Sequence, residues 1–116
     1  MKDLLAKLEA APEGEQYDLI TEALRYAFEH DWITSEAYVE AVDWASSGAY
    51  LSAAMVLVPK GWWWSINQSG GPMRGEQNDL SPIYTTTLFR PRLEVRGTQG
   101  TPALAIAIDA LTAHEA

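Results

Sequence analysis

The side chains that could do chemistry in this chain are mostly carboxylates. Glu36 and Glu40 are four residues apart, so on a helix they would lie one turn apart and could share a divalent cation. Such pairs are common on any acidic helix, and no oxygen-rich loop accompanies this one. We therefore predict no metal site, and no motif in the sequence points to a cofactor.

The two histidines are the other candidates for acid–base chemistry. His30 precedes Asp31, but adjacent residues on a helix do not face each other, so a base with its orienting carboxylate is disfavoured. Stabilisation of a helix C-terminus explains His30 better. His114 lies near a C-terminus that we expect to be frayed. The chain has no cysteine, no Gly-x-Ser-x-Gly turn, no phosphate-binding loop and no paired-histidine motif. We predict that it is not an enzyme.

Charge is distributed very unevenly along the 116 residues. The formal net charge is −8, and all of it arises before Trp44; the remainder of the chain is neutral. Strong acidity disfavours direct binding to nucleic acid and to anionic membranes, because both rely on lysine and arginine. It suits solubility, or binding to a basic protein surface.

The acidic part therefore has two interpretations. One is a set of solvated helix faces with no partner. The other is a surface that resembles the phosphate pattern of nucleic acid and occupies a basic groove on a nucleic-acid-binding protein. In the second interpretation the partner-binding carboxylates are Asp18, Glu22, Glu29, Asp31, Glu36, Glu40 and Asp43.

Hydrophobic periodicity predicts four helices in this acidic half, residues 1–58. Leu4, Leu5 and Leu8 define a short first helix, residues 3–10. A second helix, residues 16–30, has the apolar set Tyr17, Ile20, Leu24, Ala27 and Phe28. Thr34 and Ser35 are N-cap residues of a third helix ending near Ala45, with Tyr38, Val42 and Ala45 inward, and residues 49–58 favour a fourth.

Strand-forming residues follow, within residues 62–96. We predict strands over Trp62–Asn67, Ile83–Phe89 and Leu93–Val95, with the last closed by Gly97 and Gly100. The segment Gln68–Pro82 is expected to be a long loop that adds partner contacts.

The last predicted element is a helix over residues 101–113. It has Thr101 as N-cap and Pro102 in the first helical position, and it is apolar on nearly every side, so we expect it to be buried against the sheet and other helices. The order of elements predicts a single α+β domain with a three-stranded antiparallel sheet, similar to an α-β-α sandwich.

Three consecutive tryptophans open the predicted sheet. Alternation puts Trp62 and Trp64 on one face, where we expect core, and Trp63 on the other, where exposure would suit a protein interface. Arg90, Arg92 and Arg96 fall at even spacings and would point the same way on an extended chain. They either bind a partner's carboxylate or phosphate, or protect a sheet edge and pair with the protein's own acids.

Three stretches resemble a family of small uncharacterised bacteriophage and prophage proteins with a phage α-β-α sandwich domain. They are LLAKLEAAPEG (Leu4–Gly14), LSAAMVLVPKGWWWSI (Leu51–Ile66) and GTPALAIAIDALTAHEA (Gly100–Ala116). The segments Tyr17–Ser47 and Ser69–Pro82 depart from the family pattern. The resemblance implies a phage or prophage gene product acting in the cytoplasm of a bacterial host, and it carries no catalytic residue to transfer.

These observations favour a non-enzymatic accessory protein that binds a host protein. Its most concrete form is an inhibitor of a bacterial immune nuclease complex, similar to an anti-CRISPR protein and serving host defence evasion. The acidic helices would bind the partner, with further contacts from Trp63, Arg90 and Arg92. The alternative is a virion-associated or scaffold protein that forms a homo-oligomer through its tryptophan-rich sheet.

Overall fold

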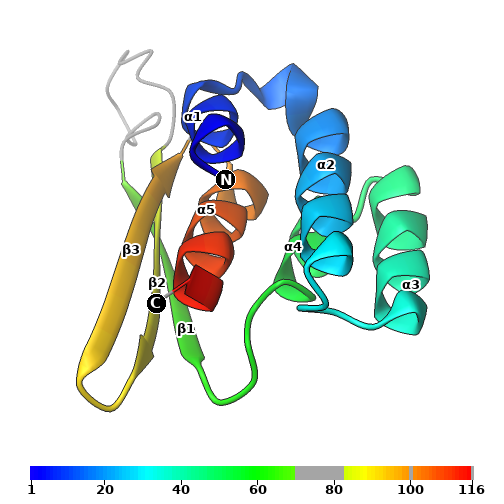
Figure 1. Cartoon of the computed structure of the whole chain (residues 1–116). Coiled ribbons are helices and arrows are strands. Elements are labelled where there is room, and N and C mark those ends of the chain that lie inside the picture. Colours follow the sequence, from blue (N-terminus) through cyan, green and yellow to red (C-terminus); the bar gives the residue numbers. More distant parts are fainter. Residues whose placement is uncertain (70–82, 100, 116) are drawn as a thin grey trace, which may run out of the picture.

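The computed structural model describes residues 1–69, 83–99 and 101–115, and it confirms the α+β class (Figure 1). The three strands are antiparallel in the order β1-β2-β3, and the C-terminal helix packs on them, as predicted. The elements, in chain order, are α1 (Lys2–Ala10), the 3₁₀ helix η1 (Glu13–Glu15), α2 (Gln16–Glu29), α3 (Ser35–Ser46), α4 (Tyr50–Met55), β1 (Trp63–Ser69), β2 (Ile83–Arg90), β3 (Leu93–Gln99) and α5 (Pro102–Glu115).

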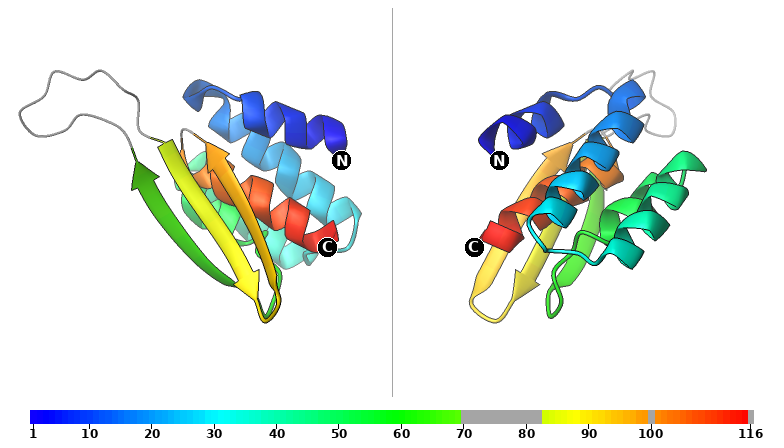
Figure 2. Two further views of the ribbon diagram at one scale, coloured as in Figure 1. Left: turned by 90° about the vertical axis from the view of Figure 1, so that its left-hand side faces the viewer. Right: turned by 45° about the vertical axis from the view of Figure 1, so that its right-hand side comes forward.

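The described helices all lie on one side of the sheet (Figures 1 and 2). Helix α5 packs on β2 and β3 and is covered in turn by α1, α2 and α4, while α3 packs on α2 and α4. The layer order is therefore sheet, then α5, then the remaining helices. This differs from a sandwich with helices on both faces, and it leaves the other sheet face without a helical cover in the described part of the chain.

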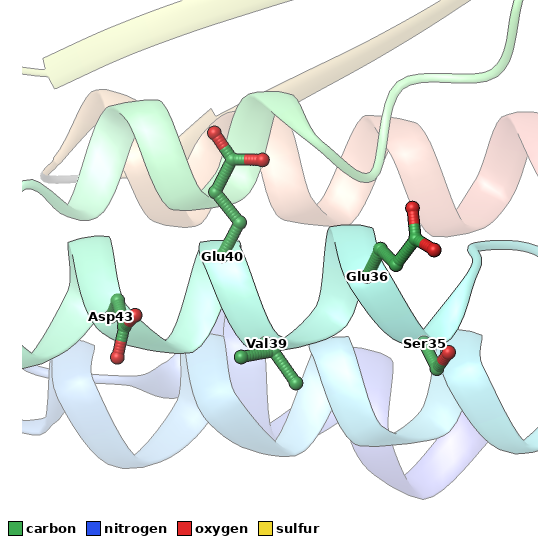
Figure 3. A pocket seen from close by; sticks show the side chains of 5 residues that line it. All are labelled: Ser35, Glu36, Val39, Glu40 and Asp43. Carbon is green, nitrogen blue, oxygen red and sulfur yellow. The ribbon is translucent and has the colours of Figure 1, made fainter.

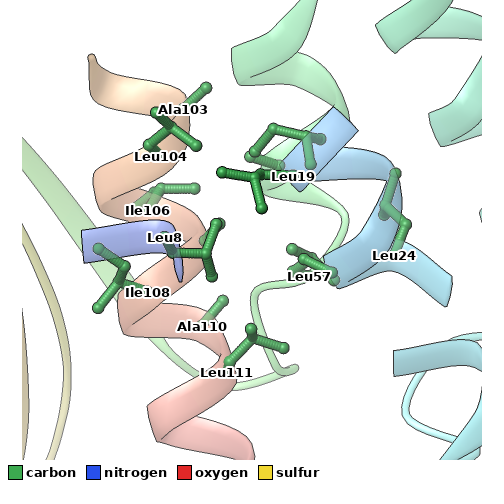
Figure 4. Packing of buried hydrophobic residues seen from close by; sticks show 14 of the residues in the cluster. Leu8, Leu19, Leu24, Leu57, Ala103, Leu104, Ile106, Ile108, Ala110 and Leu111 are labelled. Atoms are coloured by element: carbon green, nitrogen blue, oxygen red, sulfur yellow. The ribbon is translucent and has the colours of Figure 1, made fainter. Parts of the chain in front are cut away.

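Burial of α5 follows from its composition, because a helix that is apolar all round needs neighbours all round. Its side chains from Ala103 to Leu111 are all buried, as predicted. Figure 4 shows Leu104, Ile106 and Leu111 of α5 packed among leucines from α1, α2 and the segment after α4. This cluster is the main hydrophobic core.

Capping residues define where the helices start and stop. The predicted N-caps Thr34 and Thr101 are confirmed: Thr34 accepts from the amide of Ala37 at 3.1 Å, and Thr101 accepts from the amide of Leu104 at 3.3 Å. Ser35, which was also predicted as an N-cap residue, is instead the first residue of α3. Helix α2 ends in a Schellman motif, in which the Trp32 amide donates to Ala27 and the Asp31 amide to Phe28. Asp31 holds the left-handed position of this motif, with φ of 59°.

A two-residue turn, Pro91–Arg92, joins β2 to β3, and Arg90 pairs directly with Leu93. Arg92 has a φ of 70°, the value that the second position of a type II turn requires. The expectation that Arg90, Arg92 and Arg96 point the same way is therefore wrong, because the chain reverses between them. Arg90 shares the helix-facing side with Leu88, and Arg96 lies on the outer side.

Several boundaries differ from the sequence prediction. Strand β1 starts at Trp63 and continues to Ser69, so the start of the predicted loop is strand; residues 70–82 lie outside the described residues. Helix α4 ends at Met55 and not at Val58. In α2 the buried stripe is centred on Leu19, Ile20, Ala23, Leu24 and Ala27, so Tyr17 and Phe28 are exposed, contrary to the predicted apolar set.

Strand β3 continues through Gly97 to Gln99, although we expected Gly97 to end it. Gly97 is buried under α5, where a methyl group added to its Cα would lie 2.5 Å from Oδ1 of Asp109 and 2.9 Å from the carbonyl oxygen of Ala105. The glycine therefore permits close approach of strand and helix, a role that glycine has within strands as well as at their ends.

Candidate partner-binding surfaces

The outer face of α3 carries the best-defined group of predicted site residues. Glu36, Val39, Glu40 and Asp43 follow the i, i+3, i+4, i+7 spacing of one helix face, and with Ser35 they line a shallow concavity of about 460 Å³ (Figure 3). The Val39 side chain is 59% exposed in the middle of the three carboxylates. An apolar centre with a charged rim is the usual anatomy of a protein-binding patch.

The charges of this patch have no neutralising ion pair in the part of the chain that the structure describes. None of Glu36, Glu40 and Asp43 forms an ion pair with any of the described residues. Asp43 also lies in the last turn of α3, which contains no basic residue. The C-terminal end of a helix carries partial negative charge, so a carboxylate there is unfavourable for the fold. Residues that destabilise their own secondary structure are expected at positions where function requires them.

Two acidic residues of α2, unlike those of the α3 face, have basic residues near them. Glu22 accepts a hydrogen bond from Nζ of Lys7 at 3.2 Å, an exposed ion pair between α1 and α2. Asp18 and Glu22 also line a groove of about 200 Å³ with Arg25 and Tyr38, between α2 and α3. Their charge is therefore partly offset by nearby bases, and they are weaker candidates than the α3 carboxylates.

Glu29 and Asp31 lie at the connection between α2 and α3. Both are exposed, and Asp31 is held in its Schellman position by the backbone. His30 is the C-cap residue between them, and its Nδ1 lies 2.8 Å from the carbonyl oxygen of Tyr26. The capping role predicted for His30 is confirmed. Glu29 and Asp31 are two further exposed acids at the end of α2, close in sequence to the start of α3.

A second exposed surface is formed by aromatic residues of the sheet. Trp63 pairs with Phe89, which pairs with Glu94, so these three form one row on the uncovered face. Trp63 is 69% exposed, as its placement on the second face predicted. Trp64 is 53% exposed, so the prediction that it belongs to the core is wrong. It does point to the helix side, but the main contacts of α5 are with β2 and β3.

The predicted arginines lie on the sheet and not beside the acidic helices: Arg90 and Arg92 are at the β2–β3 turn, and Arg96 is in the middle of β3. The Arg90 guanidinium lies 5.4 Å from the ring centroid of Trp62, a cation–π distance, and Trp62 itself is half-buried against the core. Arg92 is exposed in the turn between β2 and β3. Arg96, on the outer face, donates to Oε1 of Glu94 at 2.8 Å. The structure therefore divides the predicted site residues into two surfaces, separated by α5.

His114 is better ordered than the sequence indicated. Helix α5 continues to Glu115, and Nε2 of His114 lies 2.7 Å from the carbonyl oxygen of Leu57. Its ring stacks on Trp32 with centroids 4.6 Å apart, at the wall of a pocket of about 400 Å³. Burial lowers the pKa of His114 below its usual 6.5, although the hydrogen bond to the Leu57 carbonyl opposes the shift. The hydrogen bond and the ring stacking hold His114 in place against Leu57 and Trp32.

The sequence did not predict a role for one buried acid, Asp109. Asp109 of α5 is 1% exposed, and its Oδ2 accepts a hydrogen bond from the hydroxyl of Thr86 at 2.6 Å. Oδ1 has no hydrogen-bond partner among the described residues. Burial raises the pKa of Asp109 to about 7, while Thr86 and, more weakly, Arg96 pull it down. The signal was a single charged residue within the apolar run of α5.

Within residues 1–69, 83–99 and 101–115, no three acids and histidines gather where they could hold a metal ion. The buried Asp109 lies under the sheet, away from both surfaces. The arrangement presents two kinds of surface. One is the α3 face, where carboxylates surround an exposed valine, and the other is the sheet, where aromatic side chains are exposed.

None of the described helices combines the length and the apolar character needed to cross a membrane.

Comparison with known proteins identifies no relative: no family model, curated protein or solved structure matches this chain. The resemblance to phage proteins therefore stays a prediction from the three sequence stretches described above.

Proposed function

We propose that this chain is a non-enzymatic accessory protein that binds a basic protein surface through the outer face of α3. The observation that carries the proposal is the exposure of Val39 among three carboxylates that have no ion-pair partner in the described residues. An unpaired acidic rim attracts a basic partner over long range, and the apolar centre gains free energy when it is covered.

The concrete target class comes from the sequence resemblance. A phage or prophage protein gains from blocking a nuclease complex of bacterial immunity, and such complexes bind nucleic acid through basic grooves. Glu36, Glu40 and Asp43 would occupy such a groove in place of phosphates, in the cytoplasm of the bacterial host. Glu29 and Asp31, at the end of α2, would extend the contact.

The test is inhibition of DNA cleavage by purified CRISPR effector complexes loaded with guide RNA. We expect the wild-type protein to inhibit at least one complex, with inhibition weakened by added target DNA and by salt. The triple variant Glu36→Lys, Glu40→Lys, Asp43→Lys should lose this effect. A control that reverses three exposed acids elsewhere (Glu9, Glu15 and Glu115) makes the same change in net charge.

The control separates a specific surface from general acidity. If both triple variants inhibit as well as the wild type, or if both fail equally, the α3 face is not the binding surface. Melting temperatures of the variants verify that each one is folded. If no complex is inhibited, the nuclease target is wrong, although the α3 face can still be tested against other partners.

A further inference from the structure

Strand β1 is an edge of the sheet, and it exposes a tryptophan on each of its two faces. Trp63 lies on the uncovered side and Trp64 on the helix side, and more than half of each side chain is exposed. A partner that docked on one sheet face would cover one of these residues and leave the other in water. A strand added beside β1 continues both faces at once, so it can cover both tryptophans.

The helices leave room for such a strand. Helix α5 packs on β2 and β3, and β1 forms the sheet edge away from α1 in the left-hand view of Figure 2. No backbone hydrogen bond within the described residues joins the outer edge of β1 to another segment. An edge with free amide and carbonyl groups is a template for pairing with another chain.

The two edges of the sheet differ in the feature that normally prevents pairing. Strand β3 carries Glu94 and Arg96, whereas β1 (WWSINQS) carries no charged residue and no proline. Charged side chains and proline are common devices that protect an edge from association. Strand β1 lacks both devices over its seven residues.

We propose that the β1 edge binds the β1 edge of a second copy of this chain, giving a two-fold symmetric dimer with one continuous antiparallel sheet. The absence of charged residues from β1 favours a second copy of the same strand as the partner. Two uncharged edges meet without repulsion, and an uncharged edge offers no attraction to a charged foreign strand. The acidic residues of α2 and α3 lie beyond α5 from the sheet, so the acids of two copies stay away from the contact.

The size of the contact is sufficient for a specific dimer. A buried tryptophan contributes about 150–250 Å², so two exposed tryptophans from each copy, with the strand edges, can bury on the order of 1,000 Å². The two-fold axis makes the contact self-complementary, as in most homodimers. The α3 faces stay exposed at the outside of the dimer, so this inference does not depend on the proposed function.

Sedimentation equilibrium over a range of concentrations tests the dimer. We expect wild-type protein to reach the mass of two chains, and Trp63→Lys and Trp64→Lys each to weaken association at least about tenfold. Phe89→Lys, on the same outer face but on the central strand, should leave the dimer intact. Val39→Lys on α3 should do the same. All four side chains are exposed, so the variants should fold, and melting temperatures check this.

The pattern of variants decides between contact modes. A wild-type protein that stays monomeric at all concentrations overturns the proposal. A dimer weakened by Phe89→Lys as much as by Trp64→Lys also overturns it, because that result means association through the sheet face. A dimer that is insensitive to both tryptophan variants places the contact elsewhere and overturns it as well.

Discussion

The hydroxyl of Thr86 donates a 2.6 Å hydrogen bond to Oδ2 of Asp109, and this bond joins the centre of the sheet to the centre of the most buried helix. Both residues are fully buried, and Oδ1 of Asp109 has no partner among the described residues. Asp109 is therefore most compatible with the fold when it is protonated. This relationship makes the stability of the protein depend on pH.

We expect the contribution of Asp109 to stability to fall as pH rises from about 4 to about 7. The ordinary pKa of aspartate is 3.8 and burial raises the pKa of Asp109 to about 7, so the folded protein holds a proton that the unfolded chain loses. The shift corresponds to on the order of 4 kcal/mol of unfolding free energy, present below pH 4 and lost by pH 7. Chemical denaturation across this range measures it.

Asp109→Asn isolates this effect, because asparagine keeps an acceptor for Thr86 and does not titrate. The difference in unfolding free energy between wild type and variant should slope between pH 4 and pH 7, with the variant relatively more stable at high pH. His114, whose lowered pKa costs stability as pH falls below 6.5, is present in both proteins and cancels from the difference. Parallel curves for the two proteins would show that Asp109 does not titrate in this range.

Gly97→Ala should destabilise the protein by about 1–3 kcal/mol, the cost of overpacking a well-packed interior. The added methyl group would meet Oδ1 of Asp109 and the carbonyl oxygen of Ala105, and the backbone atom cannot move without shifting α5. Gly14→Ala is the matched control, because nothing lies within 4 Å of its added methyl group. Equal effects at the two positions, measured by urea unfolding, would mean that the close contact does not exist.

Asp43→Lys and Glu36→Lys make the same charge change at opposite ends of α3. Asp43 lies in the last turn and Glu36 in the first, so the helix dipole predicts stabilisation by Asp43→Lys and destabilisation by Glu36→Lys, each about 0.3–1 kcal/mol. Partner binding should weaken in both. Thermal unfolding measures the effect on stability, and binding assays measure the effect on partner affinity. If Asp43→Lys strengthens binding while Glu36→Lys weakens it, in line with their effects on stability, the α3 face does not contact the partner.

Arg92→Gly should stabilise the β2–β3 hairpin by about 1 kcal/mol. Arg92 holds a φ of 70°, a conformation that costs most residues energy and costs glycine little. Arg92→Ala is the control: it removes the same charge without relieving the backbone, so it should leave stability unchanged. If alanine stabilises as much as glycine in thermal unfolding, the charge and not the backbone is responsible.

The sequence was sufficient for the order of elements, the N-caps and the buried character of α5, because these depend on local pattern. Alternation also placed Trp64 on the correct side of β1. It could not show that α5 covers β2 and β3 and leaves β1 open, which depends on how the layers pack. For this reason the core assignment of Trp64 failed.

For the site residues too, local spacing predicted some features correctly, while features that depend on tertiary packing were missed. The spacing of Glu36, Glu40 and Asp43 was enough to put them on one helix face, and the structure adds that Val39 is exposed among them. Even spacing failed for Arg90 and Arg96, because the turn between them reverses the chain. The bond between Thr86 and Asp109 joins residues 23 positions apart in sequence, so no local pattern could predict it.

Affinity capture from a bacterial host lysate, at low and at high salt, tests the central claim most directly. Three forms serve as bait: the wild type, the α3 triple variant (Glu36→Lys, Glu40→Lys, Asp43→Lys) and the control variant with Glu9, Glu15 and Glu115 reversed. Our account predicts a basic, nucleic-acid-binding partner that wild type and control retain at low salt, that high salt releases, and that the α3 variant does not bind. A partner that the α3 variant retains as well as the wild type does would contradict the account.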